Sequence, residues 1–262
     1  MISRAIMRDI KIKTMKILLS NDDGVKCDGI VKLAERLSKK HEVLVVAPDG
    51  NRSASSHSLT ISKCIKLQKI DAKGYQCYAI SGTPADCVKF AKLVFTDFDA
   101  DIVIAGINKG HNIGSDILYS GTVSIACEAS FFGNIAFSFS AFSLDETDFT
   151  YYAEQAEKII EQLLPLSSAG DVWNVNFPDK SKGEIKGYKV TKLGKHIYSD
   201  RYMPVGDNQF MLVGELIDHD ENDFDCDVEW IKKGYVTITP ILLNKTNHEK
   251  IKEVKDLCEK LL

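Results

Sequence analysis

Several features that the sequence lacks narrow the classes of protein to which it can belong. It contains no Cys-x-x-Cys pair, and its 7 cysteines are scattered along the chain, so neither a disulfide framework nor a zinc site is expected. Scattered, reduced thiols are typical of a cytoplasmic protein. No apolar run approaches the roughly 20 residues that span a bilayer. The chain also has no internal repeat and no low-complexity linker.

Charge and composition limit the partners and the size of the fold. The net charge of −4 argues against polymeric nucleic acid or a membrane surface as a partner. A locally positive or metal-bearing pocket still allows a small phosphate ester to bind. Hydrophobic residues make up 44% of the chain, enough for the core of one domain over residues 15–262. Residues 1–14 lack the apolar core and cleavage site of a signal peptide, and we interpret them as an N-terminal extension.

The hydrophobic pattern alternates short buried strands with amphipathic helices, which is typical of an α/β fold with a mostly parallel sheet. The C-terminal third changes character, with short strand patterns between loops rich in Asp, Gly and Asn. The acidic segment 218–227 lacks the spacing of a calcium loop and is expected to be solvated. We predict strands over 16–20, 43–47, 101–105, 135–140, 187–193 and 235–238, strand and hairpin structure over 59–80, and helices over 30–37, 84–94, 122–132, 150–164 and 248–261.

Polar loops follow three of the predicted strands, and together they suggest a metal site. Asp22 and Asp23 come directly after the first strand. Asn51, Arg52 and Ser53 follow the second strand, and the loop 106–108, with Gly106 and Asn108, follows the third. Ligands in doubly wound folds bind beyond the carboxyl ends of the strands. Adjacent carboxylates repel each other unless a cation or a proton lies between them, which favours a hard divalent ion with oxygen ligands.

A glycine-rich loop after the third strand leads into a helix that begins near residue 120. Ser120, Gly121 and Thr122 open this helix, and its free N–H groups predict a phosphate site. N-capping by Ser120 alone is the simpler interpretation, and both can hold together. The loop lacks the order GxGxxG or GxxxxGK[ST], which argues against a dinucleotide dehydrogenase and against a P-loop kinase.

Seven segments stand in a characteristic order along the chain, namely ILLSNDDGV (17–25), VVAPDGNRS (45–53), SLT (58–60), GTPADCV (82–88), DIVIAG (101–106), YSGTV (119–123) and GYVTITP (234–240). In these segments the chain resembles the SurE (stationary-phase survival protein) family of nucleotidases. Two departures from the family pattern are Ala54, where the family often has Gly, and His111.

The resemblance implies a fold, an ion and an assembly. The fold is a three-layer α/β/α sandwich with a Rossmann-like sheet and a C-terminal extension. The extension, about 194–230, would be exchanged between the subunits of a homodimer or homotetramer. One divalent ion per subunit, Mg²⁺ or Mn²⁺, would be held by residues matching Asp22, Asp23, Ser53 and Asn108. The activity would be hydrolysis of nucleoside 5′- or 3′-monophosphates, with some activity on short polyphosphate.

We expect metal-assisted hydrolysis with Asp22, Asp23 and Asn108 as catalytic residues. Phosphate would contact Asn51, Ser53, Gly106 and the helix start formed by Ser120, Gly121 and Thr122. His57 and His111 are candidates for the general acid. Two alternatives stay open, namely an aspartyl-phosphate phosphatase and a nucleotide-binding sensor without turnover. The first is disfavoured because position 21 is Asn, so the usual spacing of two carboxylates fails.

Overall fold

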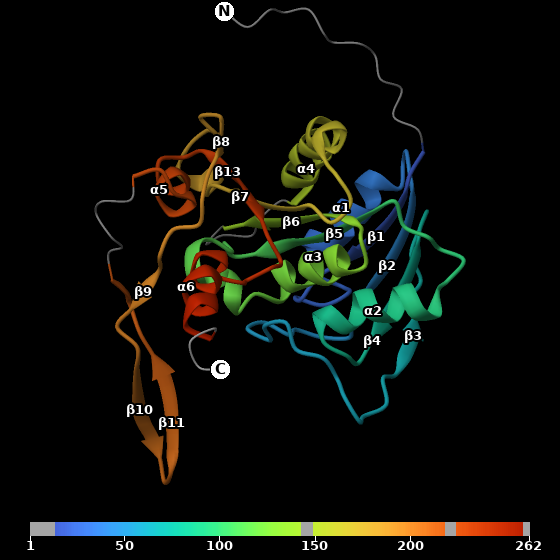
Figure 1. Ribbon diagram of the computed structural model, residues 1–262. Coiled ribbons are helices and arrows are strands. Elements are labelled where there is room, and N and C mark those ends of the chain that lie inside the picture. Colours follow the sequence, from blue (N-terminus) through green and yellow to red (C-terminus); the bar gives the residue numbers. More distant parts are fainter. Residues whose placement is uncertain (1–13, 143–148, 218–223, 259–262) are drawn as a thin grey trace, which may run out of the picture.

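A computed structural model describes residues 14–142, 149–217 and 224–258, so nearly all of the predicted extension 1–14 lies outside it. The main element is a nine-stranded sheet with the order β3-β4-β2-β1-β5-β6-β7-β13-β8 (Figure 1). Its strands are β1 (Lys16–Ser20), β2 (Glu42–Pro48), β3 (Leu67–Lys69), β4 (Gln76–Ile80), β5 (Ile102–Lys109), β6 (Ile135–Ala141), β7 (Val172–Phe177), β8 (Tyr188–Val190) and β13 (Val236–Ile241).

The centre of the sheet, from β4 to β7, is entirely parallel. β13 pairs antiparallel with β7, and β3 pairs antiparallel with β4. Leu18 of β1 lies opposite Leu44 of β2 on one side and Val103 of β5 on the other. The chain therefore runs outward from β1 in both directions, which places a topological switch point between β1 and β5.

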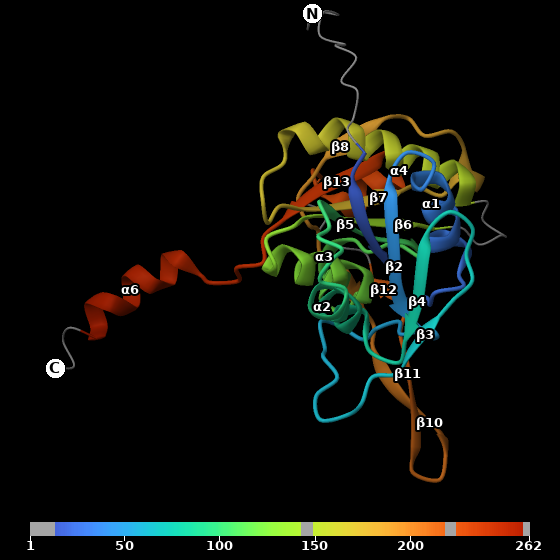
Figure 2. The same ribbon diagram turned by 90° about the vertical axis from the view of Figure 1, so that its right-hand side faces the viewer.

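Helices cover both faces of this sheet and create the three layers that the sequence predicted (Figures 1 and 2). α1 (Asp28–Leu37) and α4 (Phe149–Leu163) bury apolar faces in one core cluster. α2 (Pro84–Val94) and α3 (Gly121–Phe131) pack into the cluster on the other face. No helix among residues 14–142, 149–217 and 224–258 is long and apolar enough to cross a membrane.

Local signals in the sequence set the starts of the helices on the second face. Thr83 caps α2 by accepting from the Asp86 N–H, and the Asp86 carboxylate accepts from the Thr83 N–H in return. Such a capping box satisfies two N–H groups that the helix leaves free. Ser120 likewise accepts from the Val123 N–H at 3.0 Å and begins α3. Both starts agree with the sequence prediction.

The structure differs from the sequence prediction at several places. The third strand does not end at Gly106, since β5 continues to Lys109 with a shift of register between Ala105 and Asn108. β7 was not predicted, although a polar, glycine-containing segment (167–171) comes directly before it. Asp227, which we expected in a solvated loop, is fully buried at the start of α5 (Asp227–Lys232). Residues 218–223 of that acidic segment lie outside the described part of the chain.

The C-terminal third adds small elements beyond the sheet. The predicted hairpin segment 59–80 contains only β3 and β4 as strands. β9 (Ile197–Tyr198) pairs with β12 (Leu216–Ile217), and between them β10 (Arg201–Gly206) and β11 (Gln209–Val213) form a hairpin. This hairpin extends away from the sheet in Figure 1, and α6 (His248–Cys258) projects from the body in Figure 2.

Candidate active site

The polar loops after β1, β2 and β5 meet at the carboxyl edge of the sheet, beside the switch point. The Arg52 N–H donates to the Asp22 carbonyl at 2.7 Å, which joins the first two loops. The Lys109 N–H donates to Asp23 Oδ2 at 3.1 Å, which joins the first loop to the end of β5. The Ser56 N–H donates to the Tyr119 carbonyl at 3.1 Å. The start of α3 therefore belongs to the same cluster of loops.

Asp22 is the most enclosed acidic group of this cluster, with only 4% of its surface exposed. Its Oδ1 accepts a short hydrogen bond from the Thr122 hydroxyl. Burial raises the pKa of Asp22, the Thr122 hydroxyl opposes that rise, and the charge of Asp23 adds to it. An anionic carboxylate is therefore costly at this position unless a cation lies close to it.

Asp23 is half-buried and lies next to Asp22 along the chain. Burial raises its pKa, and the hydrogen bond from the Lys109 N–H partly offsets that rise. Both carboxylates thus favour a positive partner. This combination is expected for a pair that binds a divalent ion, and the same burial would otherwise favour a shared proton.

Gly121 lies against the first carboxylate. A Cβ at this position would approach Asp22 Cβ to 2.7 Å and Pro84 Cγ to 2.9 Å, so any side chain would displace the acid. Gly106 has another role, because a Cβ there would approach the Phe139 carbonyl to 2.3 Å. We attribute Gly106 to the close pairing of β5 with β6 rather than to the phosphate contact that the sequence suggested.

The remaining predicted site residues lie in the same loops, but each has a different hydrogen-bond or ion-pair partner. Asn51 and Ser53 are exposed, and Asn51 Oδ1 accepts from the Ser53 N–H at 2.8 Å. Asn108 donates through Nδ2 to the Gly110 carbonyl at 2.9 Å. The Thr122 hydroxyl, expected on phosphate, instead contacts Asp22. The Arg52 guanidinium pairs with Asp49 at 2.8 Å.

The donor set of this edge suits a hard cation. The part of the chain that the structure describes contains no group of three or more His, Cys, Asp and Glu side chains able to hold a metal. An ion at the carboxylate pair would therefore complete its shell with neutral oxygens, which Ser53 and Asn108 can supply. Oxygen-only shells of carboxylates, neutral donors and water are typical of Mg²⁺ and Mn²⁺.

The two candidate histidines lie in very different surroundings. His57 Nε2 lies 2.8 Å from the carboxylate of Glu128 in α3, and Glu128 also forms an ion pair with Lys89 at 3.3 Å. His111 is hydrogen-bonded to the Phe177 carbonyl at 2.8 Å. Burial lowers the pKa of His111 to about 4, so its ring is neutral near pH 7. His111 is therefore unsuited to be the general acid that the sequence suggested.

A second group of contacts, which the sequence did not reveal, fixes the approach to the start of α3. The Asp227 carboxylate accepts from the Gly114 N–H at 2.9 Å and from the Gly194 N–H at 2.8 Å. His196 Nδ1 lies 2.6 Å from Asp116 Oδ2. These bonds fasten the short 3₁₀ helix Gly114–Leu118, just before Ser120, to the C-terminal segment. In the sequence Asp227 is one acid of an acidic run, so nothing local distinguishes it as the residue that makes these hydrogen bonds.

Comparisons with known proteins identify the family of the chain. The family described as survival protein SurE matches residues 17–200. A protein of Thermosipho melanesiensis named 5′-nucleotidase SurE is 40% identical over 254 residues, 94% of this chain and 98% of that protein. A relative of the same name from a Thermoanaerobacter species is 44% identical over 246 residues, 90% of this chain and 96% of that protein. The crystal structure of a SurE protein from Aquifex aeolicus matches with a TM-score of 0.79 at 37% identity, covering 92% of this chain and 98% of that chain. The chain belongs to the SurE family.

Proposed function

We propose that the protein is a divalent-metal-dependent phosphatase that hydrolyses nucleoside monophosphates to nucleoside and phosphate. The observation that carries this proposal is the pair of a buried Asp22 and a half-buried Asp23, at the switch point of the sheet and beside the N–H groups of a helix start. Membership of the SurE family and the name 5′-nucleotidase of its relatives support the choice of substrate.

In this proposal the residues of the chain bind the metal ion and the substrate, and they stabilise the negative charge of the phosphoryl oxygens. Asp22, Asp23, Ser53 and Asn108 would hold one divalent ion, Mg²⁺ or Mn²⁺. When bound, the ion polarises the phosphoryl group and lowers the pKa of a water molecule. The N–H groups after Ser120 face the phosphoryl oxygens with the positive end of the α3 dipole. The Thr122 hydroxyl holds Asp22 in position, and the Lys109 N–H does the same for Asp23.

The finer features of the activity are also part of the proposal. We propose that both 5′- and 3′-monophosphates are hydrolysed and that short polyphosphate is a secondary substrate. These features rest on the family resemblance. The proposed partners are the substrate and further copies of the chain in a homodimer or homotetramer, with no nucleic acid polymer and no membrane. The scattered cysteines support a cytoplasmic location, since most described thiols are buried or half-buried.

The test is phosphate release from AMP, GMP and their 3′ isomers, with Mn²⁺, with Mg²⁺ and with EDTA. We expect turnover that EDTA abolishes, and a loss of at least about 100-fold in Asp22→Asn and in Asp23→Asn. Asp49→Asn is the matched control, because Asp49 is an exposed acid of the second loop that pairs with Arg52. Wild-type turnover in either variant of the pair would refute the metal site.

The same assay separates the two alternatives. AMP that binds without any phosphate release would identify a sensor. A phosphorylated aspartate trapped during turnover would identify an aspartyl-phosphate phosphatase. Either result would replace the proposed mechanism.

A further inference from the structure

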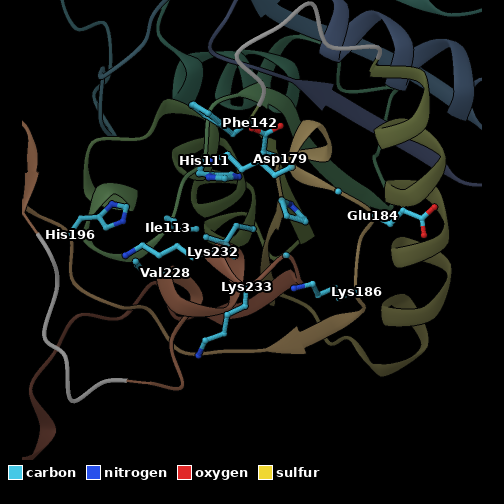
Figure 3. A pocket seen from close by; sticks show the side chains of 15 residues that line it. His111, Ile113, Phe142, Asp179, Glu184, Lys186, His196, Val228, Lys232 and Lys233 are labelled. Atoms are coloured by element: carbon cyan, nitrogen blue, oxygen red, sulfur yellow. The ribbon is translucent and has the colours of Figure 1, made fainter.

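A cavity separate from the carboxylate pair opens beyond the carboxyl ends of β6 and β7. It has a volume of about 360 Å³, within the range of about 300–1,000 Å³ that small-molecule sites occupy. His111 and Phe142 form one wall, and α5 with the loop after β7 forms the others (Figure 3). Neither Asp22, Asp23 nor Ser53 lines it. The proposed activity therefore leaves this cavity without a role.

The rim of the cavity is positively charged. Lys182, Lys186, Lys232 and Lys233 line it, against the acids Asp179 and Glu184. Glu184 extends away from the lysines in Figure 3. Lys182 and Lys186 form no ion pair with any residue in the ranges 14–142, 149–217 and 224–258. Two lysines that face a cavity and are not neutralised by a described acidic side chain favour an anionic ligand there, because their positive charge can attract it.

The floor of the cavity is apolar and contains one buried acceptor. Ile113, Val228 and Ile231 are buried there, and the rings of His111 and Phe142 lie 5.4 Å apart. Asp179 is only 8% exposed, and its Oδ1 accepts from the Ser181 N–H and hydroxyl. Its Oδ2 is buried and bonds to none of the described residues. Buried polar atoms are normally paired, so this oxygen is free to accept from a donor outside the residues that the structure describes.

We propose that this cavity is a second ligand site, which takes a small organic phosphate independently of the metal site. The phosphate group lies among Lys182, Lys186 and their neighbours on α5. The apolar body of the ligand packs against Phe142 and Ile113, and a hydroxyl or amino group of the ligand donates to Asp179 Oδ2. A free inorganic ion would leave the apolar floor and this acceptor unused, whereas an organic phosphate satisfies all three features.

The test uses ADP as the probe and isothermal titration calorimetry in EDTA. EDTA removes the metal that would draw phosphate to Asp22 and Asp23, and the lysine variants then measure how much of the remaining ADP binding comes from the lysine cavity. We expect Lys182→Glu/Lys186→Glu to weaken ADP binding at least about tenfold, which corresponds to about 1.4 kcal/mol. Lys182→Arg/Lys186→Arg retains the charge and is expected to bind within about threefold of wild type.

Lys66→Glu/Lys69→Glu is the matched control, because it reverses two exposed charges at β3, on the opposite edge of the sheet. Its ADP affinity should equal that of wild type. Three results would overturn the proposal: no binding of ADP in EDTA, equal binding by both charge-reversal variants, or loss of AMP hydrolysis in Lys182→Glu/Lys186→Glu. The last result would make the cavity part of the catalytic site. Failure of the metal-dependent activity itself would leave the EDTA titration unchanged, so the two proposals fail separately.

Discussion

Thr122 and Asp22 lie 100 positions apart in the chain, yet the hydroxyl of the first donates to the carboxylate of the second. The bond joins the end of β1 to the first turn of α3. It supplies part of the stabilisation that the buried Asp22 anion needs, since the Thr122 hydroxyl opposes the rise in its pKa caused by burial. The geometry of the acidic pair therefore depends on how α3 begins.

Replacing Thr122 with valine should weaken metal binding without unfolding the protein. Valine has nearly the same shape but no hydroxyl, so Asp22 loses a donor that fixes its orientation. We expect about 10- to 100-fold weaker Mn²⁺ affinity, the usual effect of losing a group that orients a metal ligand. The measurement is the Mn²⁺ concentration that gives half-maximal phosphate release. Thr122→Ser keeps the hydroxyl and is the control, and equal Mn²⁺ dependence in both variants would contradict the role of the bond.

Gly121→Ala should damage the site by crowding. Its Cβ would lie 2.7 Å from Asp22 Cβ and 2.9 Å from Pro84 Cγ, so the acid or the helix start must move. We expect turnover to fall at least about tenfold and the free energy of unfolding to fall by about 1–3 kcal/mol. Gly50→Ala is the control, because a Cβ there meets nothing within 4 Å. If the two variants retain the same turnover, the close fit of Gly121 does not matter.

The positions of the site residues could be predicted from sequence because each follows a strand pattern. Lys16–Ser20 is a short apolar run ended by two acids, and polar loops follow 43–47 and 101–105. Parallel strands bring such ends together, so the convergence of these loops follows from topology. The partner of each side chain does not follow. Whether the Thr122 hydroxyl faces a ligand or Asp22 depends on a rotation of α3 that local patterns do not encode.

The parts that sequence reasoning missed depend on distant contacts. Asp227 is one acid in an acidic run, and its carboxylate accepts from the N–H groups of Gly114 and Gly194, which come to it from far along the chain. β7 is different, because the polar, glycine-containing segment 167–171 before it is a local signal for its start. The β5 strand runs through Gly106 because β6 pairs with it beyond that point, and such a pairing overrides the local preference of glycine.

Glu157 of α4 should stabilise the protein in a pH-dependent way. It is only 4% exposed and forms ion pairs with Arg36, in the last turn of α1, at 2.5 Å and with Lys40, in the turn after α1, at 2.9 Å. Burial raises the pKa of Glu157, but the bonds from Lys40 and Arg36 outweigh it and hold the pKa below the ordinary 4.5. Because the folded pKa is the lower one, this stabilisation is complete above about pH 4.5. It is lost as the pH falls through the folded pKa.

We therefore expect Glu157→Gln to lower the free energy of unfolding by about 1–3 kcal/mol at pH 7 and much less near pH 3. The control is Glu154→Gln, since Glu154 reaches the same Arg36 at 3.3 Å but is 43% exposed. Exposed pairs contribute about 0–1 kcal/mol. Urea unfolding at both pH values measures the difference. A loss in Glu157→Gln that is equal at pH 7 and pH 3 would show that packing, not charge, is responsible.

Replacing Ala54 with glycine should stabilise the protein. Its φ of 55° lies in the left-handed region, which costs a residue with a Cβ about 1–2 kcal/mol. Glycine adds about 0.5–1 kcal/mol of entropy cost, so Ala54→Gly should gain about 0.5–1 kcal/mol and raise the melting temperature. Ser55→Gly, at a neighbour without positive φ, should instead lower it. Calorimetry of both variants decides, and a lower melting temperature in Ala54→Gly would contradict the expected relief of strain.

The β10–β11 hairpin should be an interface between copies of the chain. An isolated two-stranded ribbon is marginal in water, and this one exposes Tyr202 by 70% and Phe210 by 63% as it extends from the body. A second copy that covers these side chains would explain both its order and its composition, in agreement with the assembly implied by the family resemblance. We expect Tyr202→Glu/Phe210→Glu to shift the mass measured by light scattering to that of one chain. Leu166→Glu, at an apolar side chain 74% exposed on the main body, should leave the mass of the oligomer unchanged. An oligomer that survives the hairpin variant would place the interface elsewhere.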